Sequence, residues 1–166
     1  IVGSLGASAG FLGVIAGGWV GDRLRVKHAA GRLWVVIFGA IAPIPAIAIA
    51  FTTDNATLFF AMLFPAQALA SAALGAAAAT TQDLVLPRMR GTATASFFIG
   101  TTLIGLALGP YLAGRVSALT SSLSTGVLSL LLTVPIALIA AIMAARLLPA
   151  AEASAQERAR AAGEDI

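Results

Sequence analysis

The chain has 166 residues, of which 59% are apolar and 10% are charged, and its mean hydropathy is +0.97. A soluble domain carries about 25% charged residues, so this composition argues against a soluble enzyme or a nucleic-acid-binding protein. The absence of cysteine excludes a disulfide framework and thiolate-bound zinc, and the formal net charge of +3 is informative only through the positions of the charged residues.

Five uncharged, mainly apolar runs follow one another along the chain, and runs of about 20 such residues cross a bilayer as helices. We predict an all-α fold, a polytopic membrane helix bundle over residues 1–149. The Ser- and Thr-rich segment Ser117–Thr125 is expected to be a loop. Residues 150–166, rich in Ala with mixed charges, form a tail that is either a short surface helix or disordered. The predicted spans are about 1–20, 33–53, 58–80, 92–114 and 125–145.

The first apolar run does not fit a secretory signal peptide. It is too long, it has no basic leader, and four further spans follow it. The chain also begins at Ile1, inside an apolar run and without a preceding loop. We therefore expect the chain to be a piece of a longer protein.

The positions of Lys and Arg predict the orientation of the bundle. With alternating spans, nine of the ten Lys and Arg residues fall on one side, and Arg115 falls on the other. Short cytoplasmic loops collect Lys and Arg. We therefore predict that loops 22–32 and 84–90 and the C-terminal tail are cytoplasmic, in an inner or plasma membrane.

Residues able to carry out catalysis are scarce. His28 is the only histidine and lies in the basic loop, with no Cys and no paired carboxylates near it, so no metal-ligand set is present. The many Ser and Thr residues have no base partner that the sequence identifies. We predict no catalytic residue, no metal, no cofactor and no enzymatic activity.

Glycine and proline are concentrated within the predicted spans. Gly13, Gly17 and Gly21 of the first span are four residues apart, and such spacing lets another helix backbone approach one face closely. Two interpretations remain open, either simple helix packing or smooth faces that slide against each other in a transporter or channel. Prolines within a span remove a backbone hydrogen bond and can bend the helix. They are Pro43, Pro45, Pro65, Pro110 and Pro135.

Polar residues within the spans are few. Gln67 and Ser71 are four residues apart and therefore share a helix face. An amide at mid-span faces a protein interior or a cavity, so either a solute-facing surface or an ordinary interhelical bond would explain Gln67. Asp83, close in sequence to Arg88 and Arg90, is expected to form an interfacial ion pair.

Two segments resemble the major facilitator superfamily. Gly18–Arg23 (GWVGDR), with Lys27 after it, resembles the superfamily's loop signature of Gly, any residue, aliphatic, small, Asp and Arg. The chain departs from this signature at Arg25 and Val26, where the family often has Gly and Arg. The segment Pro87–Ala95 (PRMRGTATA), followed by Gly105–Pro110 (GLALGP), looks like the family's eleventh helix.

This resemblance implies a twelve-helix fold of two halves that works by alternating access. The chain would supply helices eight to twelve of a secondary transporter for a small organic or lipid-like solute. Its partners would be the missing N-terminal half, membrane lipids and the solute, with no nucleic acid. Thr81–Pro87 (TQDLVLP) also looks like spinster-type members, which handle lysolipids and sphingoid lipids. The alternative is a non-transporting membrane subunit or scaffold.

The resemblance also implies roles for individual residues. Asp22 would be a gate carboxylate facing a helix N-terminus or an Arg of the missing half, while Arg23 and Arg32 would support that loop and meet anionic headgroups. The first, third and fourth spans would line the cavity, and the second and fifth would face lipid. The gating residues would be Asp22, Arg23, Gly18, Arg90, Gly91, Gly105, Gly109 and Pro110. The solute-lining residues would be Ser8, Gln67, Ser71 and Thr101.

Overall fold

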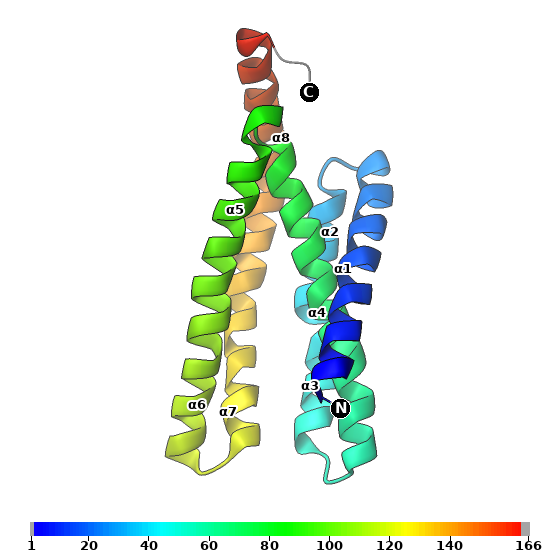
Figure 1. Cartoon of the computed structure of the whole chain (residues 1–166), viewed down its shortest axis with the longest axis vertical. Helices are drawn as coiled ribbons and strands as arrows, with labels where there is room; N and C mark the ends of the chain where they lie inside the picture. The colour runs from blue at the N-terminus through cyan, green and yellow to red at the C-terminus, as the bar shows by residue number, and fades with distance from the viewer. Residues whose placement is uncertain (1, 164–166) are drawn as a thin grey trace.

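The computed structural model describes residues 2–163, and every regular element within them is a helix (Figure 1). Most are α-helices, and short 3-10 or π segments connect some of them. In chain order they are α1 (Val2–Lys27), α2 (Gly31–Ile41), α3 (Pro43–Thr52), α4 (Ala56–Asp83), η1 (Pro87–Met89), α5 (Arg90–Thr101), η2 (Thr102–Leu108), α6 (Gly109–Thr120), α7 (Leu123–Ser129), η3 (Leu130–Thr133) and α8 (Val134–Ala162).

Within the described residues, five helical stretches are long and apolar enough to cross a membrane. This confirms the predicted all-α bundle of five membrane-spanning helices. The helices are longer than the predicted spans, because each continues into the charged segments at one end of the bundle. The five stretches are Gly3–Lys27, Gly31–Thr52, Ala56–Asp83, Pro87–Thr120 and Leu123–Ala161.

Three of the prolines within the predicted spans lie near the start of a helical segment that directly follows another. Pro43 is the first residue of α3, and Pro110 and Pro135 lie in the first turns of α6 and α8. Proline has no N–H to donate, and its ring clashes with the carbonyl four residues earlier. The π segment Thr102–Leu108 accordingly lies just before Pro110. Pro65, by contrast, lies inside an uninterrupted α4.

The expected loop at Ser117–Thr125 is wrong. Helix α6 continues to Thr120, and only Ser121 and Ser122 separate it from α7. The Thr120 hydroxyl donates to the Val116 carbonyl at 2.8 Å, so this polar side chain is satisfied within the helix. Ser121 ends α6 in the left-handed conformation at φ 53°, and the Ser122 side chain caps α7.

The C-terminal tail is not a separate element. Helix α8 continues from the last span to Ala162, and its final turns extend past the other helices (Figure 1). Ala155 and Ala159 on this extension are 3% and 1% exposed. Residues 150–162 of the tail are therefore helical and packed, with one face against the rest of the chain.

The five spans form two groups. Helix α4 packs against α1, α2 and α3, whereas α5–α6 and α7–α8 make an antiparallel pair joined by the contact of α6 with α7. The groups meet through α2 with α8, α4 with α5 and α3 with α7. The charged ends of both groups therefore lie at the same end of the molecule.

Small residues hold α1 against α4. A Cβ at Gly13 would lie 2.2 Å from the Ala68 carbonyl oxygen, and one at Gly17 would lie 2.3 Å from that of Ala72. No larger side chain fits between backbones this close. Of the two interpretations of the glycine spacing, helix packing explains these two glycines.

Candidate functional site

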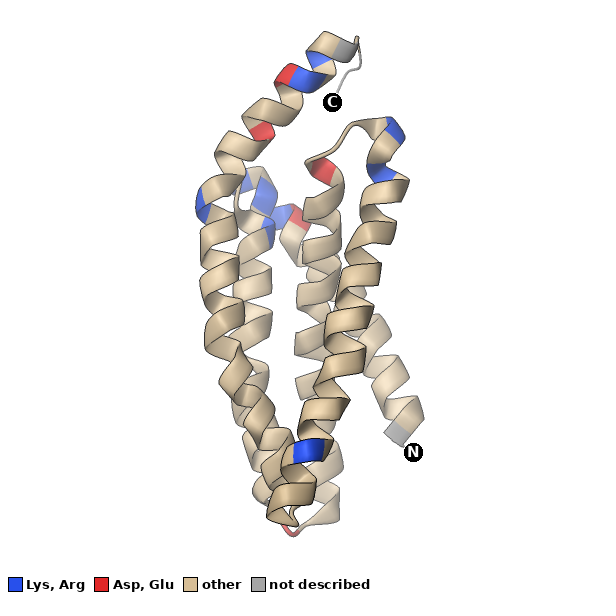
Figure 2. Cartoon of the chain, turned by 90° about the vertical axis from the view of Figure 1, so that its left-hand side faces the viewer, with Lys and Arg blue, Asp and Glu red and all other residues tan. Residues whose placement is uncertain are grey.

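Charged side chains gather at one end of the bundle. Figure 2 shows Lys and Arg in blue and Asp and Glu in red, mainly at the end where the last turns of α8 project. Arg115 on α6 and Asp54 before α4 lie toward the opposite end. The apolar middle of the bundle therefore separates two polar ends of very different charge.

Arg32, near the start of α2, connects two carboxylates at the charged end. Its Nη2 and Nε donate to Oδ1 of Asp22 at 2.7 and 2.9 Å. Its Nη1 donates to Oδ2 of Asp83 at the end of α4. The Arg32 side chain is only 16% exposed, so these ion pairs are shielded from solvent on the arginine side.

Arg25 extends this cluster to α8. It forms an ion pair with the same Oδ2 of Asp83, and its Nη2 lies 3.3 Å from Oε1 of Glu152. The five side chains thus connect α1, α2, α4 and α8. We call them the charge network, defined as Asp22, Arg25, Arg32, Asp83 and Glu152.

The charge network differs in its partners from the pairs suggested by sequence proximity. Asp83 forms the expected interfacial ion pair, but with Arg25 and Arg32. Arg32 is held by two carboxylates, so it is not free to meet headgroups as the resemblance implied. Arg23 lies outside the network, with its guanidinium 4.0 Å from the centre of the Trp19 ring.

Sequence reasoning missed Arg25 and Glu152. They are 127 residues apart, and Glu152 belongs to a tail to which no chemistry was assigned. One available signal was the position of Arg25 three residues after Asp22, on the same side of α1. The position of Glu152 depends on α8 continuing as a helix beyond the span.

A small polar cavity of about 180 Å³ adjoins the network. Arg25, Asp83 and Glu152 form part of its lining, and Arg90 at the start of α5 completes the charged wall. Gln82 also ties α4 to α5, since its Nε2 donates to Thr94 Oγ1 at 3.0 Å. Arg90, which the sequence predicted as a gating residue, therefore lies beside the charge network.

The remaining predicted gating positions lie on uncovered helix faces. A Cβ placed at any of the four glycines among them would meet no atom within 4 Å. Pro110 is exposed in the first turn of α6. In the described part of the chain, the outer face of α1 and the face of α5–α6 therefore have free space beside their glycines. The four glycines are Gly18, Gly91, Gly105 and Gly109.

The predicted solute-lining residues fall into two places. Gln67 and Ser71 lie together on α4, with Gln67 Nε2 3.5 Å from Ser71 Oγ, and Gly10 of α1 lies next to that hydroxyl. Ser8 and Thr101 bond their hydroxyls to carbonyls of their own helices. The structure therefore groups Gln67 with Ser71, and it places Ser8 and Thr101 on separate helices.

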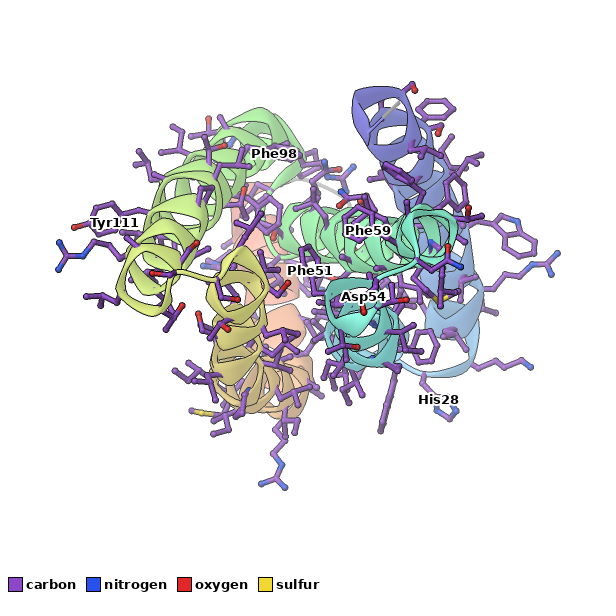
Figure 3. The ribbon with its side chains drawn as sticks, turned by 90° about the horizontal axis from the view of Figure 1, so that it is seen from below. His28, Phe51, Asp54, Phe59, Phe98 and Tyr111 are labelled. Atoms are coloured by element: carbon purple, nitrogen blue, oxygen red, sulfur yellow. The ribbon has the colours of Figure 1, made fainter. Side chains whose placement is uncertain are left out.

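No cluster of metal-binding side chains is present among the described residues. His28 is exposed at the turn between α1 and α2, and Figure 3 shows it projecting from the rim of the bundle. Phe51 and Phe59, near the opposite end of the bundle, form an edge-to-face pair with ring centroids 5.5 Å apart. These aromatic residues pack α3 against α4 and do not contribute to the charge network.

Comparison with known proteins finds one clear similarity. The chain is 32% identical over 137 residues to a protein described as an MFS-type efflux pump from Mycolicibacterium smegmatis. The aligned region is 80% of this chain and 32% of that protein, so the chain spans about a third of the relative's length. No family model matches the chain, and no solved structure matches it. The five apolar helices and this similarity identify an integral membrane protein.

Proposed function

We propose that the chain is part of a secondary transporter of the major facilitator superfamily and contributes helices eight to twelve. The observation that carries this proposal is the 137-residue similarity to an MFS-type efflux pump. The chain's length relative to that protein agrees with five spans out of twelve. Because the relative is described as an efflux pump, export is the direction we propose.

The charge network supports a gating role for the charged end. Asp22 belongs to the segment that resembles the superfamily's loop signature, although α1 continues through this segment to Lys27, so that most of the loop expected at 22–32 is helical. Its side chain is 61% exposed although it accepts two bonds from Arg32. An exposed carboxylate can exchange its partner when another charged surface approaches. We propose that Asp22 binds the facing half when this end is shut and that this end is cytoplasmic.

The uncovered faces of α1 and α5–α6 support a second body packed against this one. We propose that the missing N-terminal half covers Gly18, Gly105 and Gly109, with the solute between the halves near Gln67 and Thr101. Helices that carry only small side chains at such contacts rock with little steric resistance.

For the solute we propose a small organic or lipid-like molecule. The resemblance of Thr81–Pro87 to spinster-type members suggests lysolipids or sphingoid lipids as a more specific class. These residues lie at the end of α4 and in the turn after it, beside the charge network. They are therefore far along α4 from Gln67. Their position connects them with the proposed gate more directly than with the proposed solute site.

Thiol labelling tests the cavity without knowledge of the solute. The chain has no cysteine, so Gln67→Cys introduces a single thiol into it. In the complete reading frame that contains this chain, with any other cysteines removed, we expect a membrane-impermeant maleimide to label Gln67→Cys. Ile41, midway along the second span, is 46% exposed. We propose that this span faces lipid, so Ile41→Cys is the control and should resist labelling.

The same experiment distinguishes the alternative of a non-transporting membrane subunit. In a scaffold, the Gln67 side chain would make an ordinary interhelical hydrogen bond. The thiol of Gln67→Cys would then be as protected from the maleimide as the thiol of Ile41→Cys. Equal, slow labelling of both variants would therefore reject the transporter proposal. Labelling of Gln67→Cys alone would support it.

A further inference from the structure

A groove lies between α1 and α2, with α4 as its floor. Its walls include Val20 and Leu24 of α1 and Trp34 and Phe38 of α2, while Leu69 and Ala72 come from α4. Its volume is about 460 Å³, and every residue that lines it is apolar. Ligand pockets have volumes of about 300–1,000 Å³, so the groove is large enough for a ligand.

The groove opens to the outer surface of the helix bundle. Trp34 and Phe38 are 59% and 61% exposed, one turn apart on the outer side of α2. On α1 the groove extends from Ala16 to Leu24, a length of about 12 Å at 1.5 Å per residue. It therefore runs along the membrane-spanning helices toward the charged end.

Two cations stand at the charged end of the groove. Lys27 follows Val20 and Leu24 on the same face of α1, since these residues are three and four positions apart. Lys27 is exposed, and no ion pair to it is found among the described residues. The Arg23 guanidinium lies over the Trp19 ring, 4.0 Å from its centre, and no ion pair to Arg23 is found among the described residues, so its N–H groups are available to an anion.

The two other arginines of α1 and α2 at this end, Arg25 and Arg32, already pair with carboxylates. Arg32 pairs with Asp22 and Asp83, and Arg25 pairs with Asp83 and Glu152. The positive charge that remains for an external ligand near the groove is therefore on Lys27 and Arg23. An apolar groove that ends at two available cations matches the two parts of an anionic lipid.

We propose that this groove binds one acyl chain of an anionic phospholipid whose phosphate is held by Lys27 and Arg23. Apolar contacts alone do not favour one lipid over another, because bulk acyl chains are equally apolar. The selectivity comes from the phosphate, since each Lys or Arg near the surface attracts anionic lipid. This site lies outside the charge network and does not depend on the transporter proposal.

Tryptophan fluorescence can detect a lipid in the groove. The chain has two tryptophans, so Trp19→Phe leaves Trp34 as the only indole and preserves an aromatic ring below Arg23. This variant is reconstituted into phosphatidylcholine vesicles with either brominated phosphatidylglycerol or brominated phosphatidylcholine at equal mole fraction. Bromine quenches on contact, and we expect brominated phosphatidylglycerol to quench Trp34 more strongly.

Charge variants test the anchor. On the Trp19→Phe background, Lys27→Ala should lower the relative association constant for brominated phosphatidylglycerol about fivefold. Lys27 is exposed and makes no described ion pair, so the substitution leaves the fold intact. Arg115→Ala removes an equal charge from the opposite end and should leave the preference unchanged.

Three results would overturn the proposal. Equal quenching by the two brominated lipids would show a groove filled by lipid of any headgroup. A phosphatidylglycerol preference that survives Lys27→Ala would place the anionic lipid elsewhere. Quenching by neither lipid would show that a protein segment covers Trp34.

Discussion

At the scale of single residues, Asp83 and Asp22 play different parts in the charge network. One oxygen of Asp83 accepts from both Arg25 and Arg32, and its side chain is only 23% exposed. Asp22 pairs with Arg32 alone and is 61% exposed. If the Asp22 carboxylate moves away from Arg32, Arg32 keeps its ion pair with Asp83, so no cation of the network is left without a partner. Asp22 is therefore the member of the network that can exchange partners at low cost.

We predict that Asp22→Asn loosens the gate. The amide keeps the shape of the side chain but loses the charge that strengthens both bonds to Arg32. On the Gln67→Cys background in the complete protein, the maleimide applied from the charged end should react about fivefold faster. Asp54→Asn, a matched change near the opposite end, should leave the rate unaltered. An unchanged rate in Asp22→Asn would remove this carboxylate from the gating mechanism.

At the scale of elements, α1 carries two kinds of glycine. Gly13 and Gly17 are pressed against the backbone of α4, whereas Gly18, the next residue, faces open space. Spacing along the sequence does not separate the two kinds, because both lie in the same glycine-rich helix. The position of the neighbouring helix decides which glycine is structural.

Adjacent substitutions test this difference. Gly17→Ala forces a Cβ to within 2.3 Å of the Ala72 carbonyl oxygen, so the helices must separate, at a cost of about 1–3 kcal/mol. Gly18→Ala meets no atom within 4 Å and should be neutral or should stabilise the helix by up to about 1 kcal/mol. Thermal unfolding of the purified chain in detergent measures both. A similar loss of stability in the two variants would contradict the packing described here.

How much of this could be predicted differs between elements. The five spans follow from hydropathy, since a bilayer requires long apolar helices whatever their packing. The loop expected near Ser117 was wrong because hydroxyls such as that of Thr120 can bond within a helix. The Arg25–Glu152 contact could not be predicted, because it depends on how α1 and α8 meet in space.

At the scale of the whole molecule, the two helix groups are unequally covered. In the first, α4 packs closely on α1 and α2, and glycines of those helices contact it. In the second, the glycines of α5–α6, Gly105 and Gly109 among them, have open space beside them. The second group therefore offers a smooth face for another part of the protein.

Gly105→Leu distinguishes a covered face from an exposed one. In this chain alone the leucine meets no atom near its Cβ, so thermal stability in detergent should not fall. In the complete protein we expect the leucine to collide with the N-terminal half, and labelling of Gln67→Cys should no longer respond to Asp22→Asn. Two results would argue against this face as the contact between the halves. One is a normal response of Gln67→Cys labelling to Asp22→Asn in the complete protein, and the other is a loss of thermal stability in this chain alone.

The separation of charge from the apolar middle has an electrical consequence. Moving one elementary charge through a potential of 100 mV changes its energy by about 2.3 kcal/mol. The sequence places no Asp, Glu, Lys, Arg or His near the centre of any of the five spans. When these helices rock, the membrane voltage therefore does almost no work on them. In a transport cycle, voltage would act on the solute, on a coupling ion or on residues outside this chain, and these helices would follow passively.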